Sequence, residues 1–293
     1  MSVESETSYR LGRATIRRVR ETVLAGIAPA YLYPDLKLGL LTAHERELLL
    51  SAKEMPEGTV ALSIHTWLVE LDGKRILIDT GIGNDKDRPF SSLFHRLNNP
   101  FLERLEAVGA AADKIDYVLT THLHVDHVGW NTQRVAGQWV PTIPKARYAF
   151  AQAELDFFAT PRGEARRMVF EDSVAPVIAA GQAEIIGPEG GRFLDVFTFH
   201  PTAGHSAGHM SIGLEVDGER ALFTGDVMHN PVQVLRPEWN SAFCLEAEPA
   251  RRSRTWLLKQ AVEKDLTLFT AHFPRTSAGK VTRTTHGFDW HYV

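Results

Sequence analysis

The stretch THLHVDHVGWN, from Thr121 to Asn131, places three histidines and one aspartate within six residues. It follows the apolar run IDYVLTT, so we expect it to lie in the loop at the end of a strand, where functional groups gather on a rigid scaffold. Residues i and i+2 of an extended segment point to one side, so His122 and His124 can face one metal ion. A turn after them would direct Asp126 and His127 towards a neighbouring point.

These residue types match the chemistry of a metal site. Neutral imidazoles and carboxylates suit zinc and related divalent ions. Without a metal, the cluster would bury polar groups beside a strand, which is costly unless each finds a partner. One H-x-H alone is weak evidence, but H-x-H-x-D-H predicts a metal-binding loop. A non-catalytic structural metal site is the alternative, although such sites are usually coordinatively closed.

Further ligands are expected downstream, because these side chains cannot complete the shells of two ions. TAGHSAGH places His205 in a glycine-rich turn between strands, and LFTGDVMH places Asp226 directly after a strand. LFTAHFP places His272 after the last strong strand. His209 follows His205 by four, and we expect it to support a ligand rather than to be one.

Two echoes within the chain indicate the fold. ALSIHTWLVELDGKRILIDTG reads as strand, Asp72-Gly73 turn and strand, and MSIGLEVDGERALFTGD repeats the pattern at Asp217-Gly218. DYVLTTH (residues 116–122) also resembles DLTLFTAH (265–272), each an apolar strand that leads into a histidine. Two related halves of strands and helices would pack as two sheets between helices. Chance similarity between buried strands is the alternative.

We expect a single domain over residues 1–293, because no low-complexity linker divides the chain. Residues 1–57 look like an N-terminal extension packed on it, with a strand in RATIRRVRETVL and a helix opened by a Thr42–Glu45 capping box. This extension carries no chemistry that the sequence identifies. FLERLEAVGAAADK and ARRMVFEDSVAPVIAAG read as helical.

The composition fits an ordinary globular protein with a sizeable core. The net charge of −4 argues against nucleic-acid binding. Cys244 is the one cysteine, so neither an intramolecular disulfide nor a thiolate zinc cage can form. No signal peptide and no long apolar run are visible, which predicts a soluble, cytoplasmic protein without a membrane partner. The oligomeric state stays open, with a homodimer as one option.

The motif series resembles that of the metallo-β-lactamase superfamily of dinuclear hydrolases. H-x-H-x-D-H, G-H-S-x-G-H, G-D after a strand and a strand-end histidine follow in that order, and LIDTGIG (residues 77–83) matches an Asp-Thr-Gly loop. The resemblance runs from about Thr59 to about Pro274 and implies an α/β fold, an αββα sandwich of two mixed β-sheets with two pseudo-symmetric halves. It also implies that Asp79 orients ligand imidazoles.

The resemblance implies two divalent metal ions, with Zn²⁺ expected and Mn²⁺, Fe²⁺ or Co²⁺ as alternatives. One ion would be held by His122, His124 and His205, the second by Asp126, His127 and His272, and Asp226 would bridge both.

Within the superfamily the chain looks most similar to N-acyl-homoserine lactonases and methyl parathion hydrolase. The implied activity is attack by a metal-bridging hydroxide that opens a lactone or cleaves a related small-molecule ester. Asp126 would carry the proton. His229, which stands where lactonases have a tyrosine, would donate to the oxyanion, and packing behind Asp226 is the alternative for it. A phosphotriesterase is the alternative. Trp130, Trp239 and Phe243 are candidates for the pocket wall, and a plain core or surface role is an equal alternative for each.

Overall fold

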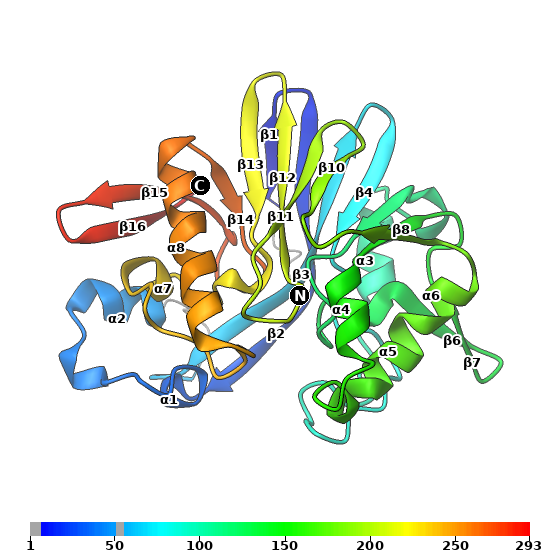
Figure 1. Ribbon diagram of the computed structural model, residues 1–293, viewed down its shortest axis with the longest axis horizontal. Coiled ribbons are helices and arrows are strands. Elements are labelled where there is room, and N and C mark those ends of the chain that lie inside the picture. The colour runs from blue at the N-terminus through cyan, green and yellow to red at the C-terminus, as the bar shows by residue number, and fades with distance from the viewer. Residues whose placement is uncertain (1–6, 51–55) are drawn as a thin grey trace. The chain divides into compact units, whose positions relative to one another are not determined.

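The structure is a computed structural model that describes residues 7–50 and 56–293 (Figure 1). The chain divides into two units. The first comprises Met1–Thr22 and Ile64–Gly191, and the second comprises Val23–Ser63 and Arg192–Val293. That the chain acts as one domain stays a prediction.

The first sheet is mixed, with the strand order β1-β2-β3-β4-β5-β8-β9. Its strands are β1 (Ser8–Leu11), β2 (Ala14–Ile27), β3 (Val60–Leu71), β4 (Lys74–Ile78), β5 (Tyr117–Leu119), β8 (Arg147–Ala151) and β9 (Ala183–Ile186). β1 pairs antiparallel with β2 and β3 with β4, whereas β4, β5, β8 and β9 run parallel. The predicted N-terminal extension therefore supplies two strands of this sheet.

Short helices and one hairpin complete the first unit. They are α3 (Phe101–Ala107), η2 (Ala112–Lys114), η3 (Gly129–Asn131), β6 (Thr132–Val135), β7 (Gln138–Pro141), α4 (Gln152–Phe157), η4 (Glu164–Arg166), α5 (Arg167–Ser173) and α6 (Ala175–Ala179). The core joins strand residues such as Leu77, Val118 and Phe150 to helix residues such as Leu105 and Val169. This core supports the end of β5, from which the first histidine loop emerges.

The second sheet is also mixed and follows the chain order β10-β11-β12-β13-β14-β15-β16. Its strands are β10 (Gly191–Phe193), β11 (Phe197–Pro201), β12 (Met210–Val216), β13 (Glu219–Phe223), β14 (Thr267–Phe269), β15 (Ala278–Thr284) and β16 (Gly287–Tyr292). The helices of this unit are α1 (Pro29–Leu32), η1 (Leu38–Leu40), α2 (Ala43–Leu49), η5 (Gly225–Val227), α7 (Val232–Leu235) and α8 (Ala247–Glu263). Its core includes Leu222 and Leu268 on strands and Leu257 and Leu258 on α8.

The two halves repeat one strand arrangement, as the sequence echoes predicted. In each, an antiparallel hairpin (β3–β4 or β12–β13) turns through an Asp-Gly pair with positive φ at both residues. The second strand of each hairpin then pairs in parallel with a short strand, β5 or β14. His122 and His272 each stand three residues after the end of that strand. Equivalent loops thus carry predicted ligands of the two units.

The helix predictions are confirmed in position but not always in length. Thr42 and Glu45 form the predicted capping box at the start of α2. The segment ARRMVFEDSVAPVIAAG is interrupted at Val174 (φ −122°), where α6 begins with Pro176 in its first turn. Proline has no N–H for a continued helix and restricts the residues before it, so two short helices form instead of one. No helix in the described ranges has the length and apolar character that a membrane crossing requires.

Candidate metal centre

The first histidine loop brings its imidazoles together beyond the end of β5. The ring centroid of His122 lies 4.5 Å from that of His124 and 4.0 Å from that of His127. His122 and His127 are buried, whereas Asp126 is half-buried, with its Oδ1 3.9 Å from Nε2 of His127. The predicted ligands of this loop therefore form one cluster within the first unit.

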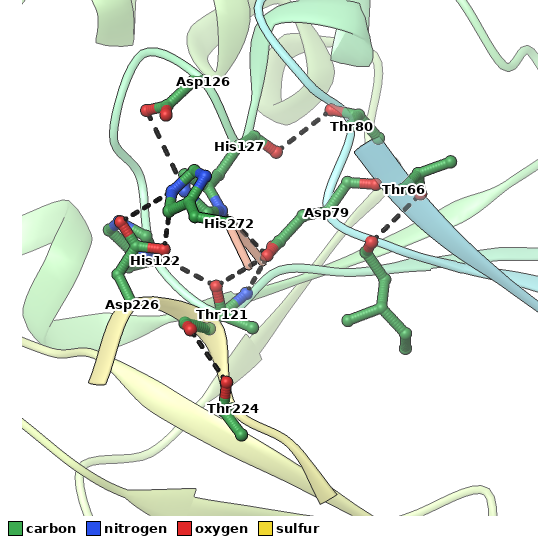
Figure 2. A network of polar contacts seen from close by, with 12 residues as sticks. Thr66, Asp79, Thr80, Thr121, His122, Asp126, His127, Thr224, Asp226 and His272 are labelled. Carbon is green, nitrogen blue, oxygen red and sulfur yellow. Dashed lines mark hydrogen bonds and ion pairs between the residues drawn. The ribbon is translucent and has the colours of Figure 1, made fainter. Parts of the chain in front are cut away.

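Asp79 at the end of β4 holds this loop (Figure 2). Its carboxylate accepts hydrogen bonds from the backbone N and from Oγ1 of Thr121, both at 2.8 Å, and lies 2.9 Å from Nδ1 of His127. The contact through Nδ1 turns the Nε2 edge of the ring away from Asp79. Asp79 has a φ of 58°, and Thr66 donates to its carbonyl oxygen, which fixes this left-handed conformation. The Asp79 carboxylate thus fixes the orientation of the His127 imidazole, a predicted ligand.

In the second unit, three imidazoles converge on one buried carboxylate. Nε2 of His205 and Nε2 of His229 each lie 3.2 Å from Oδ2 of Asp226, and Nε2 of His272 lies 2.9 Å from Oδ1. All four side chains are buried. Figure 2 shows His272 facing Asp226, and Nδ1 of His272 lies 3.0 Å from the carbonyl oxygen of Ser63.

The local backbone explains where Asp226 points. β13 ends at Phe223, and Gly225 with a φ of 52° turns the chain into η5. The backbone N of Asp226 then donates to Nε2 of His209 at 2.9 Å. Nδ1 of His209 contacts Oγ1 of Thr202 at 2.8 Å, so both ring nitrogens make hydrogen-bond contacts within the protein. His209 supports Asp226, in keeping with its predicted role.

His229 lies closer to the cluster than the sequence analysis assumed. His205, Asp226 and His229 present ligand atoms that all lie within 4.8 Å of one another. The backbone N of His229 donates to Oε1 of Gln233, which also accepts from the hydroxyl of Tyr33. Burial lowers the pKa of His229, although the neighbouring Asp226 acts in the opposite direction. Within residues 7–50 and 56–293, no group hydrogen-bonds Nδ1 of His229.

The suggested pocket aromatics separate into different environments. Trp130 is buried and stacks on Phe101 at 5.4 Å, so it belongs to the core of the first unit. Trp239 packs against Tyr33 at 6.0 Å. Phe243 is 38% exposed, and its ring lies 5.7 Å from that of His229. Of the three, Phe243 is the one that lies beside the candidate site.

The buried carboxylate of Glu21 was not among the residues that the sequence singled out. Glu21 in β2 is 1% exposed and accepts a hydrogen bond from Nε1 of Trp130. The sequence shows only that Glu21 stands between Val19 and Leu24, and both of these residues are buried in β2. A glutamate that is buried among apolar residues needs hydrogen-bond partners.

Comparisons with known proteins agree with this architecture. The chain belongs to the metallo-β-lactamase superfamily, whose family model matches residues 59–272. No curated protein sequence matches the chain. The predicted α/β metallo-β-lactamase fold with two mixed sheets is confirmed, and the protein is an enzyme, a hydrolase of this superfamily.

Three solved structures illustrate the likeness. The hydrolase AbOPH of the β-lactamase superfamily has a TM-score of 0.82 at 24% identity, covering 100% of this chain and 99% of that one. AidC, a dizinc quorum-quenching lactonase solved with the product N-hexanoyl-L-homoserine, has a TM-score of 0.78 at 20% identity, with 98% and 97% covered. A probable metal-dependent hydrolase from Staphylococcus aureus has a TM-score of 0.75 at 18% identity, with 97% and 99% covered. At these identities the likeness establishes the fold.

Proposed function

We propose that this protein is a dinuclear metal-dependent hydrolase that opens lactones or cleaves related carboxylic esters. The observation that carries the proposal is the convergence of His205, His229 and His272 on the buried Asp226 carboxylate. Bringing so many polar groups out of water is costly, and a bound cation would offset that cost. Imidazole and carboxylate donors are the ligands that zinc and related divalent ions take.

The proposed ligand set draws on both clusters. His122, His124 and His205 would hold one ion, Asp126, His127 and His272 the other, and Asp226 would bridge them. When bound, such a metal pair makes a water molecule acidic enough to attack near neutral pH and polarises the carbonyl group. Zn²⁺ is the metal we propose, and the dizinc state of AidC supports it.

The chain's own groups would complete the reaction. Asp126, which is half-buried in its loop, would take a proton from the attacking water and return it to the departing alkoxide. His229 would donate a hydrogen bond to the substrate oxygen on which negative charge develops. Phe243, whose exposed ring lies beside His229, would contact an apolar part of the substrate. No covalent intermediate with the protein is required.

The test is a substrate panel measured on protein loaded with zinc. We expect hydrolysis of N-acyl-homoserine lactones and aryl esters with a higher kcat/KM than that of a phosphotriester such as paraoxon. The Asp226→Asn variant serves as the control for metal-dependent turnover. A preference of the wild type for the phosphotriester would replace the lactonase assignment with the phosphotriesterase alternative. Stoichiometric metal binding without turnover of any substrate in the panel would contradict the lactone and ester assignment.

A further inference from the structure

Glu21 is a buried carboxylate that lies outside the segment matched by the family model. It belongs to β2, whereas the match begins at residue 59. Its two oxygens accept four hydrogen bonds. The donors are Ile82 N (2.6 Å), Gly83 N (3.2 Å), Asn99 Nδ2 (3.2 Å) and Trp130 Nε1 (2.9 Å). An ionised carboxylate is acceptor-only, so it can satisfy all four donors at once.

The groups that Glu21 holds are continuous with the candidate ligand loop. Ile82 and Gly83 end the segment that begins at Asp79, the residue that contacts His127. Thr80 donates its backbone N–H to the carbonyl of His127 at 2.7 Å and accepts from the backbone N of Trp130 at 2.9 Å. Segments 79–83 and 127–130 thus form a pair of crossed loops, and Glu21 contacts one end of each.

The crossing has little room for adjustment. A Cβ atom added at Gly81 would lie 2.1 Å from Oε2 of Glu21, and one added at Gly129 would lie 1.7 Å from the carbonyl oxygen of Ile82. The backbone of Glu21 is itself fixed, because Arg104 donates to its carbonyl oxygen at 2.7 Å. In such tight packing, a shift of the carboxylate is transmitted to the loops rather than absorbed.

We propose that Glu21 is a positioning residue of the metal centre: through segment 79–83 it sets the place of the Asp79 carboxylate and hence the orientation of the His127 imidazole. The inference rests on the proposed metal site. It gives the N-terminal strands a part in that site, although they carry no ligand. Partners that orient ligands typically change metal affinity by about 10–100-fold when removed.

Two substitutions test the role of the carboxylate. Glu21→Gln keeps the shape but turns an amide NH₂ group towards donors that need an acceptor. Glu21→Asp keeps the charge and withdraws it by one methylene. Arg17→Gln is the matched control, because Arg17 lies on the same strand and pairs with Glu70, away from the crossed loops. Each protein is stripped of metal, and its zinc affinity is measured by competition with a chromogenic chelator.

We expect Glu21→Gln to bind zinc about 10-fold more weakly than the wild type, the lower end of the range for direct partners of a ligand, and Glu21→Asp to fall between the two. Arg17→Gln should stay within about twofold of the wild type, as expected for a change that touches no orienting group. Hydrogen exchange on the metal-free proteins provides a second readout. Amides of residues 79–83 and 127–130 should exchange faster in Glu21→Gln, whereas those of β5 should not.

A merely structural role would give a different result. If Glu21→Gln unfolds more readily but binds zinc as tightly as the wild type, the positioning role is wrong. If that variant does not fold, the same affinity criterion is applied to Glu21→Asp, and unchanged affinity there overturns the inference. The zinc titration needs no substrate. A wild type that binds zinc but hydrolyses no lactone would therefore reject the proposed function and leave this inference standing.

Discussion

At the scale of single residues, Asp226 occupies the most demanding position in the second unit. It is buried, three imidazole Nε2 atoms lie within 3.2 Å of its oxygens, and its backbone N is held by His209. In the proposed ligand set this carboxylate would bridge the ion held by His205 and the ion held by His272. Substituting asparagine removes the negative charge and keeps the shape of the side chain, so it tests the charge separately from the packing.

Asp226→Asn should remove most turnover while the fold survives. An amide bridges two cations poorly. The loss in kcat should therefore be no smaller than the about 10–100-fold that follows removal of a group orienting a metal ligand. Steady-state kinetics and elemental analysis of the same sample measure both effects, with circular dichroism as the control for folding. Near-normal kcat with full metal content would remove Asp226 from the site.

His229 is tested separately, because its ring lies beside Asp226 but is not one of the seven proposed ligands. Losing a well-placed oxyanion donor costs roughly 10²–10³ in kcat, so His229→Ala should lower kcat for a lactone more than it raises KM. His229→Tyr should keep part of the rate, since a phenol also donates. If His229→Ala instead loses a metal ion, the residue is a ligand. If it leaves kcat intact, the donor role is wrong.

Lys86 is a buried lysine outside the predicted ligand set. Its Nζ donates to the carbonyl oxygen of Asp172 and lies 3.7 Å from the ring centroid of Trp139. Arg88 already pairs with the Asp172 carboxylate at 2.7 Å. Burial lowers the pKa of Lys86 from 10.5 to about 7, with Asp172 opposing and Arg88 assisting. Lys86 and Arg88 thus lie beside the same carboxylate, that of Asp172.

The stability of the protein should therefore change with pH through Lys86. Between about pH 7 and 10.5 the unfolded chain binds a proton at this lysine that the native state lacks, so wild-type stability rises with pH relative to Lys86→Met. The slope cannot exceed about 1.4 kcal/mol per pH unit for one group. Below pH 7 the cation is buried and Lys86→Met should be the more stable protein. Urea unfolding of both proteins across this pH range measures the difference in their free energies of unfolding. A difference that does not change with pH would contradict the prediction.

At the scale of elements, the crossing of segments 79–83 and 127–130 depends on glycine. Gly129→Ala should cost several kcal/mol, because its Cβ would lie 1.7 Å from the carbonyl oxygen of Ile82, which belongs to the backbone and not to a flexible side chain. Gly39→Ala is the control, since nothing lies within 4 Å of its Cβ, and its effect should stay within about 0.5 kcal/mol. Chemical unfolding of both variants gives the comparison, and equal midpoints would show that the crossing can relax.

The same elements show what the sequence could predict. The Asp72-Gly73 and Asp217-Gly218 turns were predictable because a local residue pair determines the turn. The cluster of His122, His124, Asp126 and His127 was predictable because its members are neighbours in the chain. Glu21 was not, since its partners at residues 82, 83, 99 and 130 are distant in sequence and two of them are backbone groups without a signature. The environment of His229 was also missed, because burial of a strand-end loop depends on tertiary packing.

At the scale of the whole molecule, we expect two metal ions per chain. The prediction follows from seven proposed ligands, with three for each ion and one bridge. Elemental analysis after purification without chelators should give a ratio near two, and chelation should lower Tm because ligands that bind the native state stabilise it. Restoring zinc should reverse the loss. A ratio of one that added zinc or manganese leaves unchanged would contradict the dinuclear site.

The sheet order β1-β2-β3 has a consequence for anyone who shortens this gene. A fragment that begins where the family match does, at residue 59, would lack both β1 and β2. β3 would then become the edge of the sheet, with twelve residues that are almost all buried in the intact protein. Long apolar edges recruit further strands from other molecules. Such a fragment should form insoluble aggregates, so a cut at the family boundary would fall inside the folding unit.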